Sequence, residues 1–371
     1  MALDIASYRL YNQRLSQIKL DDPTEVVSWL GAVQSQDYAG AKWAIGLRTT
    51  GLTDTDVDRA FAEGSILRTH LLRPTWHFVT PADIRWLLAL TAPRVRALMA
   101  YMDRQLEMDR TIFKKTNDVL TKTLQDGKQL TRIELGSALQ KNNINTDELR
   151  LGHLMMHAEL DGIVCSGARR GRQFTYALLE ERVPQVDPLP RDEALAKLIT
   201  QYFQSHGPAT LQDFCVWSGL VMADARNGIE MVKSEFVSEE IDGQTYWFKE
   251  TRLPAMKKSP TAYLLPNYDE YFIGFKDRSA ILNIVQQVGI QKNNPSLLAN
   301  VIILDGQVVG GWRRTLKKNE VLLEASLITK LTNTQEQAIT DAAEQFGTFL
   351  ELPVSLSFKE HTNEQRKTRS L

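Results

Sequence analysis

The sequence predicts an α+β protein of tandem winged-helix units, each a helix-turn-helix with a two-stranded wing, followed by a β-rich C-terminal domain. Three observations predict this. Helical patterns followed by two extended runs recur along the chain, turn signals separate the extended runs, and the pattern changes to mainly strands after Thr261. We expect domains at 1–108, 109–185, 190–255 and 260–360, with a polar and disordered tail at 361–371.

The first unit follows a helical segment at Ile5–Ile18. Pro23 is typical of a helix start, a second helix is expected at Ala39–Leu47, and Thr53 resembles the N-cap of a third. The strands of its wing are expected at Ile66–Leu71 and Thr75–Val79.

The second unit contains a capping-box signal, because Glu134 follows Thr131 by three residues. Its helices are expected from Thr111 to Leu124, at Ile133–Gln140 and at Asp147–Leu160, and its strands at Ile163–Ser166 and Gln173–Leu178.

The third unit contains the strongest hairpin signal, Asp242-Gly243 between two alternating runs. Its helices are expected at Asp192–Ser205, Leu211–Trp217 and Met222–Lys233, and its strands at Phe236–Ile241 and Thr245–Phe248. The last domain is expected to hold one helix at Thr334–Leu350 and strands at Val301–Leu304, Val308–Arg313, Val321–Ala325 and Val354–Phe358.

Composition is that of an ordinary globular protein, with 43% hydrophobic residues and 44 basic against 45 acidic side chains. This charge balance is not typical of a nucleic-acid-binding protein, which is often more basic. A basic patch on one face would nevertheless be enough for binding DNA. Cys165 and Cys215 belong to no C-x-x-C pair, which indicates reduced thiols and a cytoplasmic location. We find no signal peptide and no membrane-spanning stretch, and expect neither a metal nor a cofactor.

Gln34 and Gln36 are the first candidate site residues. Glutamine is neither a turn former nor a helix stop, so local structure does not require this pair between two helical patterns. A neutral amide can hold a water molecule or a base edge by hydrogen bonds without adding charge, which suits a substrate that is already cationic.

Basic residues gather in predicted turns rather than on the third helix of each unit. This favours sequence-independent phosphate contacts over base reading, the alternative being a solvated turn. The candidates for DNA binding are Arg169, Arg170 and Arg172 in the second wing and Arg313 and Arg314 in the last domain.

Two further segments mix polar and aromatic residues, and each is open to interpretation as packing or as a site. One runs from Arg68 to Phe78, and the other from Leu265 to Tyr271. The pair His153 and His157 has the spacing of zinc ligands on a helix, but no third ligand is near, which favours ordinary core or surface histidines.

Together these motifs resemble the AlkZ/YcaQ-like family of winged-helix DNA glycosylases. The resemblance rests on Val33-Gln34-Ser35-Gln36, on the block Ile66–His77 continuing into Ala82–Leu88, on Leu265–Tyr271 leading to Lys276-Asp277-Arg278, and on Gly306–Arg314. Pro74 and Ser35 depart from the family pattern, where we expect a glycine and an apolar residue.

The resemblance implies a C-shaped scaffold around duplex DNA and excision of alkylated purines, including bulky or crosslinked N7-alkylguanine. The family's catalytic glutamines correspond to Gln34 and Gln36. The remaining candidates for the pocket are Asp37, Arg73, Trp76, His77, Tyr268, Asp269 and Tyr271. The expected partner is lesion-containing duplex DNA. We expect the protein to be a monomer in the cytoplasm, associated with the nucleoid.

Alkylation at N7 makes guanine a good leaving group, so the barrier lies in the oxocarbenium-like sugar and in placing water on its far face. We expect Gln36 to orient that water and Gln34 to support the water or the sugar, with Asp37 as the alternative source of basicity. The element contains no lysine to form a Schiff base, so a monofunctional hydrolase is expected. The alternatives are a non-catalytic DNA-binding regulator or lesion sensor, and a protein-interaction scaffold.

Overall fold

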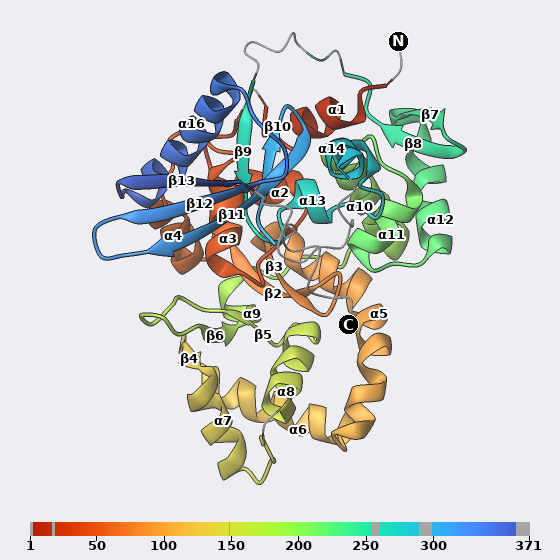
Figure 1. The fold of residues 1–371 in the computed structure, drawn as a ribbon. Helices are drawn as coiled ribbons and strands as arrows, with labels where there is room; N and C mark the ends of the chain where they lie inside the picture. The colour runs from red at the N-terminus through yellow and green to blue at the C-terminus, as the bar shows by residue number, and fades with distance from the viewer. Residues whose placement is uncertain are drawn as a thin grey trace, which may run out of the picture.

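The computed structural model describes residues 3–16, 19–147, 149–251, 253, 260–288 and 299–360. The predicted α+β class is confirmed: helices dominate the first two thirds of the chain, and a five-stranded sheet dominates the last third (Figure 1). No helix of the described part is long and apolar enough to cross a membrane. The predicted tail 361–371 and most of the Pro254–Pro260 linker lie outside the described residues.

The N-terminal part follows the predicted order of helices and hairpin. Its first helix is shorter than the expected Ile5–Ile18, because Arg14 takes a left-handed φ of 60° directly after the helix has ended. The elements are α1 (Ile5–Asn12), α2 (Pro23–Leu30), β1 (Val33–Gln34), α3 (Tyr38–Gly46), α4 (Asp54–Glu63), β2 (Leu67–Leu71) and β3 (Thr75–Val79).

The first wing has three strands in the order β1-β3-β2, not the two that the sequence predicts. The extra strand is only two residues long, too short to show an alternating pattern. It places Val33 opposite Phe78 and Gln34 opposite His77. The Gln-x-Gln element is therefore attached to the edge of the wing.

A helix that the sequence analysis does not predict, α5 (Pro81–Gln105), runs for 25 residues and tolerates Pro93 in its interior. It leads from the first wing to the far end of the molecule, where the second unit lies (Figure 1). This unit comprises α6 (Arg110–Leu124), β4 (Leu130–Thr131), α7 (Arg132–Lys141), α8 (Leu149–Leu160), β5 (Val164–Ser166), β6 (Thr175–Leu178) and the short α9 (Leu179–Arg182). The capping box of Thr131 and Glu134 is confirmed.

The third unit pairs two long strands around the predicted Asp242-Gly243 turn, where both residues have positive φ. Asp-Gly suits this turn because both central residues of a type I′ hairpin need that conformation. The elements are α10 (Arg191–His206), α11 (Leu211–Ser218), α12 (Met222–Val232), β7 (Val237–Ile241) and β8 (Gln244–Phe248).

The C-terminal sheet has the order β13-β12-β11-β10-β9, and α16 contacts β9 and β13. It begins with β9 (Ala262–Leu265), which the sequence analysis does not predict. The other elements are α13 (Glu270–Ile273), α14 (Asn283–Gln287), β10 (Val301–Leu304), β11 (Gln307–Leu316), β12 (Val321–Leu327), α16 (Asn333–Leu350) and β13 (Val354–Glu360).

The hydrophobic cores cross the expected domain boundaries. One core joins apolar residues of α1 to α4 to the C-terminal sheet and α16. A second joins the first wing and α5 to the third unit, whereas the second unit has a core largely of its own. Residues on distant parts of the chain are thus fixed around the first wing.

Candidate active site

Gln34 is held at both its backbone and its side chain. Its N–H donates to Glu270 Oε1 at 3.1 Å, and its Oε1 accepts from Arg73 Nη2 at 2.7 Å. The residue is only 7% exposed, but its surroundings are polar. Gln34 is therefore buried among polar groups and not in an apolar interior.

Gln36 lies exposed on the short link between β1 and α3. Its Oε1 accepts a long hydrogen bond of 3.4 Å from the backbone N–H of Trp76. Ser35 between the glutamines is anchored, because its N–H donates to the Trp76 carbonyl at 2.8 Å. The pair thus combines one fixed amide with one that can meet a ligand from solvent.

The next residue, Asp37, caps α3, where its side chain accepts from the Gly40 N–H at 3.0 Å. Its other oxygen lies 3.5 Å from Arg314 Nη2, on β11. A carboxylate at a helix N-terminus interacts favourably with the helix dipole. Asp37 is half-buried and lines the same cavity as Gln36.

A cavity of about 360 Å³ brings several predicted residues together. Gln36 and Asp37 line it from the first unit, Arg169 from the second wing, and Arg314 from the C-terminal sheet. Its apolar wall includes Tyr38, Phe174, Leu316, Phe346 and Leu350. Three parts of the chain therefore meet beside the exposed glutamine.

Aromatic rings and carboxylates hold the two arginines of this cavity. The Arg169 guanidinium lies 4.8 Å from the Tyr38 ring and 5.2 Å from the Phe174 ring, and it is 4.0 Å from Asp58. Arg314 remains about one-fifth exposed beside Asp37. Cations held in this way are pre-organised for an anionic ligand.

Lys42 also lines the cavity, although the sequence analysis does not propose it. Its ammonium is almost fully buried and lies 2.6 Å from Asp54 and 2.8 Å from Asp58. Two carboxylates therefore hold this amine. A buried lysine has no signature in the sequence beyond its place on the inner face of α3.

Trp76 and His77 lie on β3 next to the glutamine pair. The Trp76 ring is tilted by 43° against the His70 ring, with 4.5 Å between the ring centroids, and the Arg68 guanidinium lies 4.3 Å from the centroid of Trp76. Burial, followed by the charge of Arg73, lowers the pKa of His77 to about 3. His77 is therefore a neutral imidazole at physiological pH.

Two of the three candidates of the 265–271 segment, Asp269 and Tyr271, make buried hydrogen bonds to distant parts of the chain. Asp269 is fully buried, accepts from both Nη atoms of Arg48 at 2.8 and 2.9 Å, and caps α13. Tyr271 is buried and donates to the Gly306 carbonyl at 3.2 Å. Tyr268 is half-buried with a left-handed φ of 65°.

Glu270, between these candidates, is a residue that the sequence analysis does not propose. Its carboxylate contacts Gln34, Trp217 and His206. Burial alone would raise the pKa of Glu270, but the pKa is lowered because His206, Arg73 and the Gln34 N–H favour the charged form. The only signal in the sequence is an acid among apolar and aromatic neighbours.

The remaining basic candidates lie outside the cavity lining. Arg170 pairs with Glu134 at 2.9 Å and donates to the Gln129 carbonyl, while Arg172 and Arg313 are exposed. His153 and His157 both face Asp103, at 3.5 and 3.1 Å. No group of three or more His, Cys, Asp or Glu side chains in the described residues has the geometry of a metal site.

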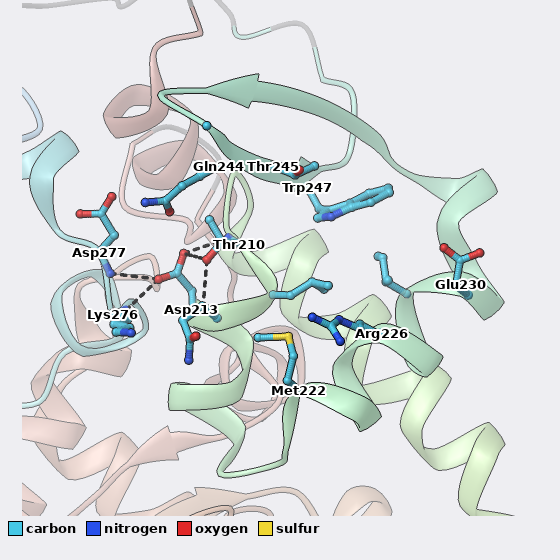
Figure 2. Close-up of a pocket in the computed structure, with 14 residues that line it drawn as sticks. Thr210, Asp213, Met222, Arg226, Glu230, Gln244, Thr245, Trp247, Lys276 and Asp277 are labelled. Atoms are coloured by element: carbon cyan, nitrogen blue, oxygen red, sulfur yellow. Dashed lines mark hydrogen bonds between the residues drawn. The ribbon is translucent and has the colours of Figure 1, made fainter.

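A larger cavity, of about 1090 Å³, lies in the third unit, and neither Gln34 nor Gln36 lines it. Arg226 of α12 projects into it, Trp247 of β8 forms part of its wall, and Asp213 accepts from the backbone N–H groups of Lys276 and Asp277 (Figure 2). Its exposed cations are balanced by acids such as Glu230 and Asp277, so its charge favours no particular ligand.

Comparison with known proteins identifies the family of the chain. The Interstrand DNA cross-link repair glycosylase of Streptomyces sahachiroi is 24% identical over 322 residues, covering 83% of this chain and 86% of that protein. The solved structure of Streptomyces sahachiroi DNA glycosylase AlkZ superposes with a TM-score of 0.77 at 22% identity, covering 95% of this chain and 98% of that one. The model of the family described as DNA glycosylase AlkZ-like matches residues 27–349. The chain therefore belongs to the AlkZ-like DNA glycosylase family and is a DNA N-glycosylase.

Proposed function

We propose that this protein is a monofunctional glycosylase that hydrolyses the N-glycosidic bond of N7-alkylguanine nucleotides in duplex DNA, including bulky or crosslinked adducts. The observation that carries the proposal is the exposed Gln36 at a cavity flanked by Arg169 and Arg314. The name of the Streptomyces sahachiroi relative, a cross-link repair glycosylase, supports the extension to crosslinked lesions.

The chemistry needs little acid catalysis. An N7-alkylated guanine is cationic and leaves without protonation, so the protein must place water and tolerate an oxocarbenium-like sugar. The Gln36 carbonyl oxygen accepts a hydrogen bond from the water and aims it at C1′. Asp37 adjoins Gln36 and provides the nearby carboxylate that favours a cationic sugar.

The contacts of Lys42 support hydrolysis by water rather than by a covalent lysine intermediate. This amine is close enough to line the cavity, but Asp54 and Asp58 hold it as an ion pair. Attack on a sugar needs a free, unprotonated amine. A strand-cleaving Schiff-base pathway through Lys42 is therefore disfavoured.

DNA binding in this proposal is sequence-independent and is made by phosphate contacts. Arg169 and Arg314 contact the backbone beside the lesion, and the exposed Arg172 and Arg313, with Arg170, extend the contact along the duplex. The cavity beside Gln36 is open to solvent, which suits bulky adducts without deep base flipping. The protein is proposed to act as a monomer on nucleoid DNA in the cytoplasm.

The direct test incubates the purified protein with duplex DNA carrying N7-methylguanine and measures freed base and abasic sites. Release of 7-methylguanine, with strand breaks appearing only after alkaline treatment, is the expected result. Binding of the duplex with no base release would instead support a regulator or lesion sensor. Absence of duplex binding at low salt would support a protein-interaction scaffold.

A further inference from the structure

We propose that Arg73 and Glu270 are positioning residues that hold Gln34 as a hydrogen-bond donor toward an oxygen atom of the damaged nucleotide. The inference rests on the proposed function, and it assigns to Gln34 a role different from that of Gln36. Gln36 accepts a hydrogen bond from the attacking water, whereas Gln34 donates one to the nucleotide.

The contact with Arg73 fixes which end of the Gln34 amide is available. A guanidinium has five donors and no acceptor, so only the amide oxygen can face it. The distance of 2.7 Å between Arg73 Nη2 and Gln34 Oε1 is that of a strong, charge-assisted bond. The contact therefore occupies the oxygen and leaves the NH₂ group as the end that can donate to another molecule.

Arg73 is itself held firmly from the third unit. Its Nη1 donates to the carbonyl oxygens of Val216 at 3.2 Å and Trp217 at 2.9 Å. Both carbonyls lie in the last turn of α11, where unsatisfied oxygens and the helix dipole attract a cation. The guanidinium thus bridges the first wing and α11 with its two ends engaged.

Glu270 completes the arrangement from the C-terminal domain. One of its oxygens accepts from the Gln34 N–H at 3.1 Å, and the other accepts from Trp217 Nε1 at 2.9 Å. Two N–H groups facing two oxygens require a carboxylate, because an amide would turn its own NH₂ toward one of them. Glu270 and Trp217 are both fully buried.

These contacts form a closed circuit. It runs from the Gln34 side chain to Arg73, from Arg73 to the Trp217 carbonyl, from the Trp217 indole to Glu270, and from Glu270 to the Gln34 backbone. The circuit holds both the backbone and the side-chain amide of Gln34 in place. Such rigidity is what a catalytic group needs, because small displacements reduce the rate steeply.

A donor suits the nucleotide better than the water. A donor on the water oxygen would draw electron density from it and make it a weaker nucleophile, whereas a donor on a sugar or phosphate oxygen leaves the water unaffected. Gln36, exposed and held only by the 3.4 Å bond from Trp76, keeps its oxygen for that water.

The test measures single-turnover release of 7-methylguanine at saturating DNA, together with the Kd for the same duplex. Arg73→Met should slow excision roughly 10-fold to 100-fold while changing Kd less than about threefold. Arg73→Lys keeps the positive charge but loses the planar guanidinium that donates to two partners at once. Its excision rate should fall between those of wild type and Arg73→Met. Arg85→Met is the matched control, since Arg85 also links two segments by donating to the carbonyls of Val183 and Pro184.

A double-mutant cycle separates positioning from mere structural support. If Arg73 acts through Gln34, then Arg73→Met should slow excision no further in a Gln34→Ala background. Glu270→Gln should behave in the same way. If Glu270→Gln fails to fold, the Arg73 variants still test the proposal. Additive losses, or equal losses in the Arg85→Met control, would overturn the inference. Absence of excision by the wild-type protein would instead overturn the proposed function.

Discussion

Gln34 lies opposite His77 in the first wing, and His77 in turn faces Arg73, the side chain that orients Gln34. His77 Nδ1 is 3.0 Å from the Thr75 carbonyl, so this nitrogen carries the proton. Nε2, which lies 3.5 Å from Arg73 Nη2, is then the unprotonated nitrogen. Burial, and then the charge of the guanidinium that a second proton would face, lowers the pKa of His77 and favours the neutral form.

This relationship predicts a pH dependence of stability. The folded-state pKa of His77 is lowered to about 3, below the unfolded value of about 6.5. The unfolded chain therefore binds the extra proton first, and stability falls as the pH drops below about 6.5. Denaturant melts between pH 7 and 5 should show a smaller loss for His77→Gln than for wild type. Parallel curves for the two proteins would contradict the assignment.

Ser35 predicts a stabilising substitution. Its side chain is fully buried, and its hydroxyl has no hydrogen-bond partner within the described part of the chain. The family pattern leads us to expect an apolar residue at this position. Ser35→Ala should raise the free energy of unfolding by about 1 kcal/mol, since it removes an unsatisfied buried polar group. A destabilised Ser35→Ala variant in urea titrations would show that the hydroxyl is satisfied.

The ion pair of Arg48 and Asp269 predicts a large loss of stability. Both side chains are fully buried, and two hydrogen bonds join them. Asp269→Asn should lower the free energy of unfolding by about 3–5 kcal/mol, because it leaves the Arg48 charge buried without its partner. Glu230→Gln, which breaks the exposed pair with Lys233, is the control and should change stability by less than about 0.5 kcal/mol. Equal effects of both changes would contradict a structural role for Asp269.

The second wing predicts a change in the salt dependence of DNA binding. Arg169 and Arg172 carry charges that the proposal assigns to phosphate contacts. Each alanine substitution should reduce the slope of log K against log salt concentration by roughly 0.9. Fluorescence anisotropy with a labelled duplex at several salt concentrations measures this slope. An unchanged slope for both variants would remove the second wing from the DNA interface.

Local signals made most of the fold predictable. The capping box at Thr131, Pro23 at a helix start and the Asp242-Gly243 turn depend on a few neighbouring residues, and the structure confirms each. The two-residue strand β1 had no such signal, because its partner β3 lies some forty residues away. The same holds for the core that joins the N-terminal helices to the C-terminal sheet.

The candidate site divides in the same way. Gln34 and Gln36 stand out because nothing in their local sequence requires them, and Gln36 meets Arg169 and Arg314 at one cavity. Glu270 and Lys42 escaped notice because their importance arises only when distant segments pack together. A buried charge cannot be recognised in a sequence without knowing which partner neutralises it.

The measurement that bears most directly on this enzyme is the rate of 7-methylguanine release by Gln36→Ala. A residue that aims the attacking water should be needed for the reaction and not for binding. The expected result is loss of detectable excision with a Kd for duplex DNA within a few-fold of wild type. Excision at the wild-type rate by Gln36→Ala would contradict the account.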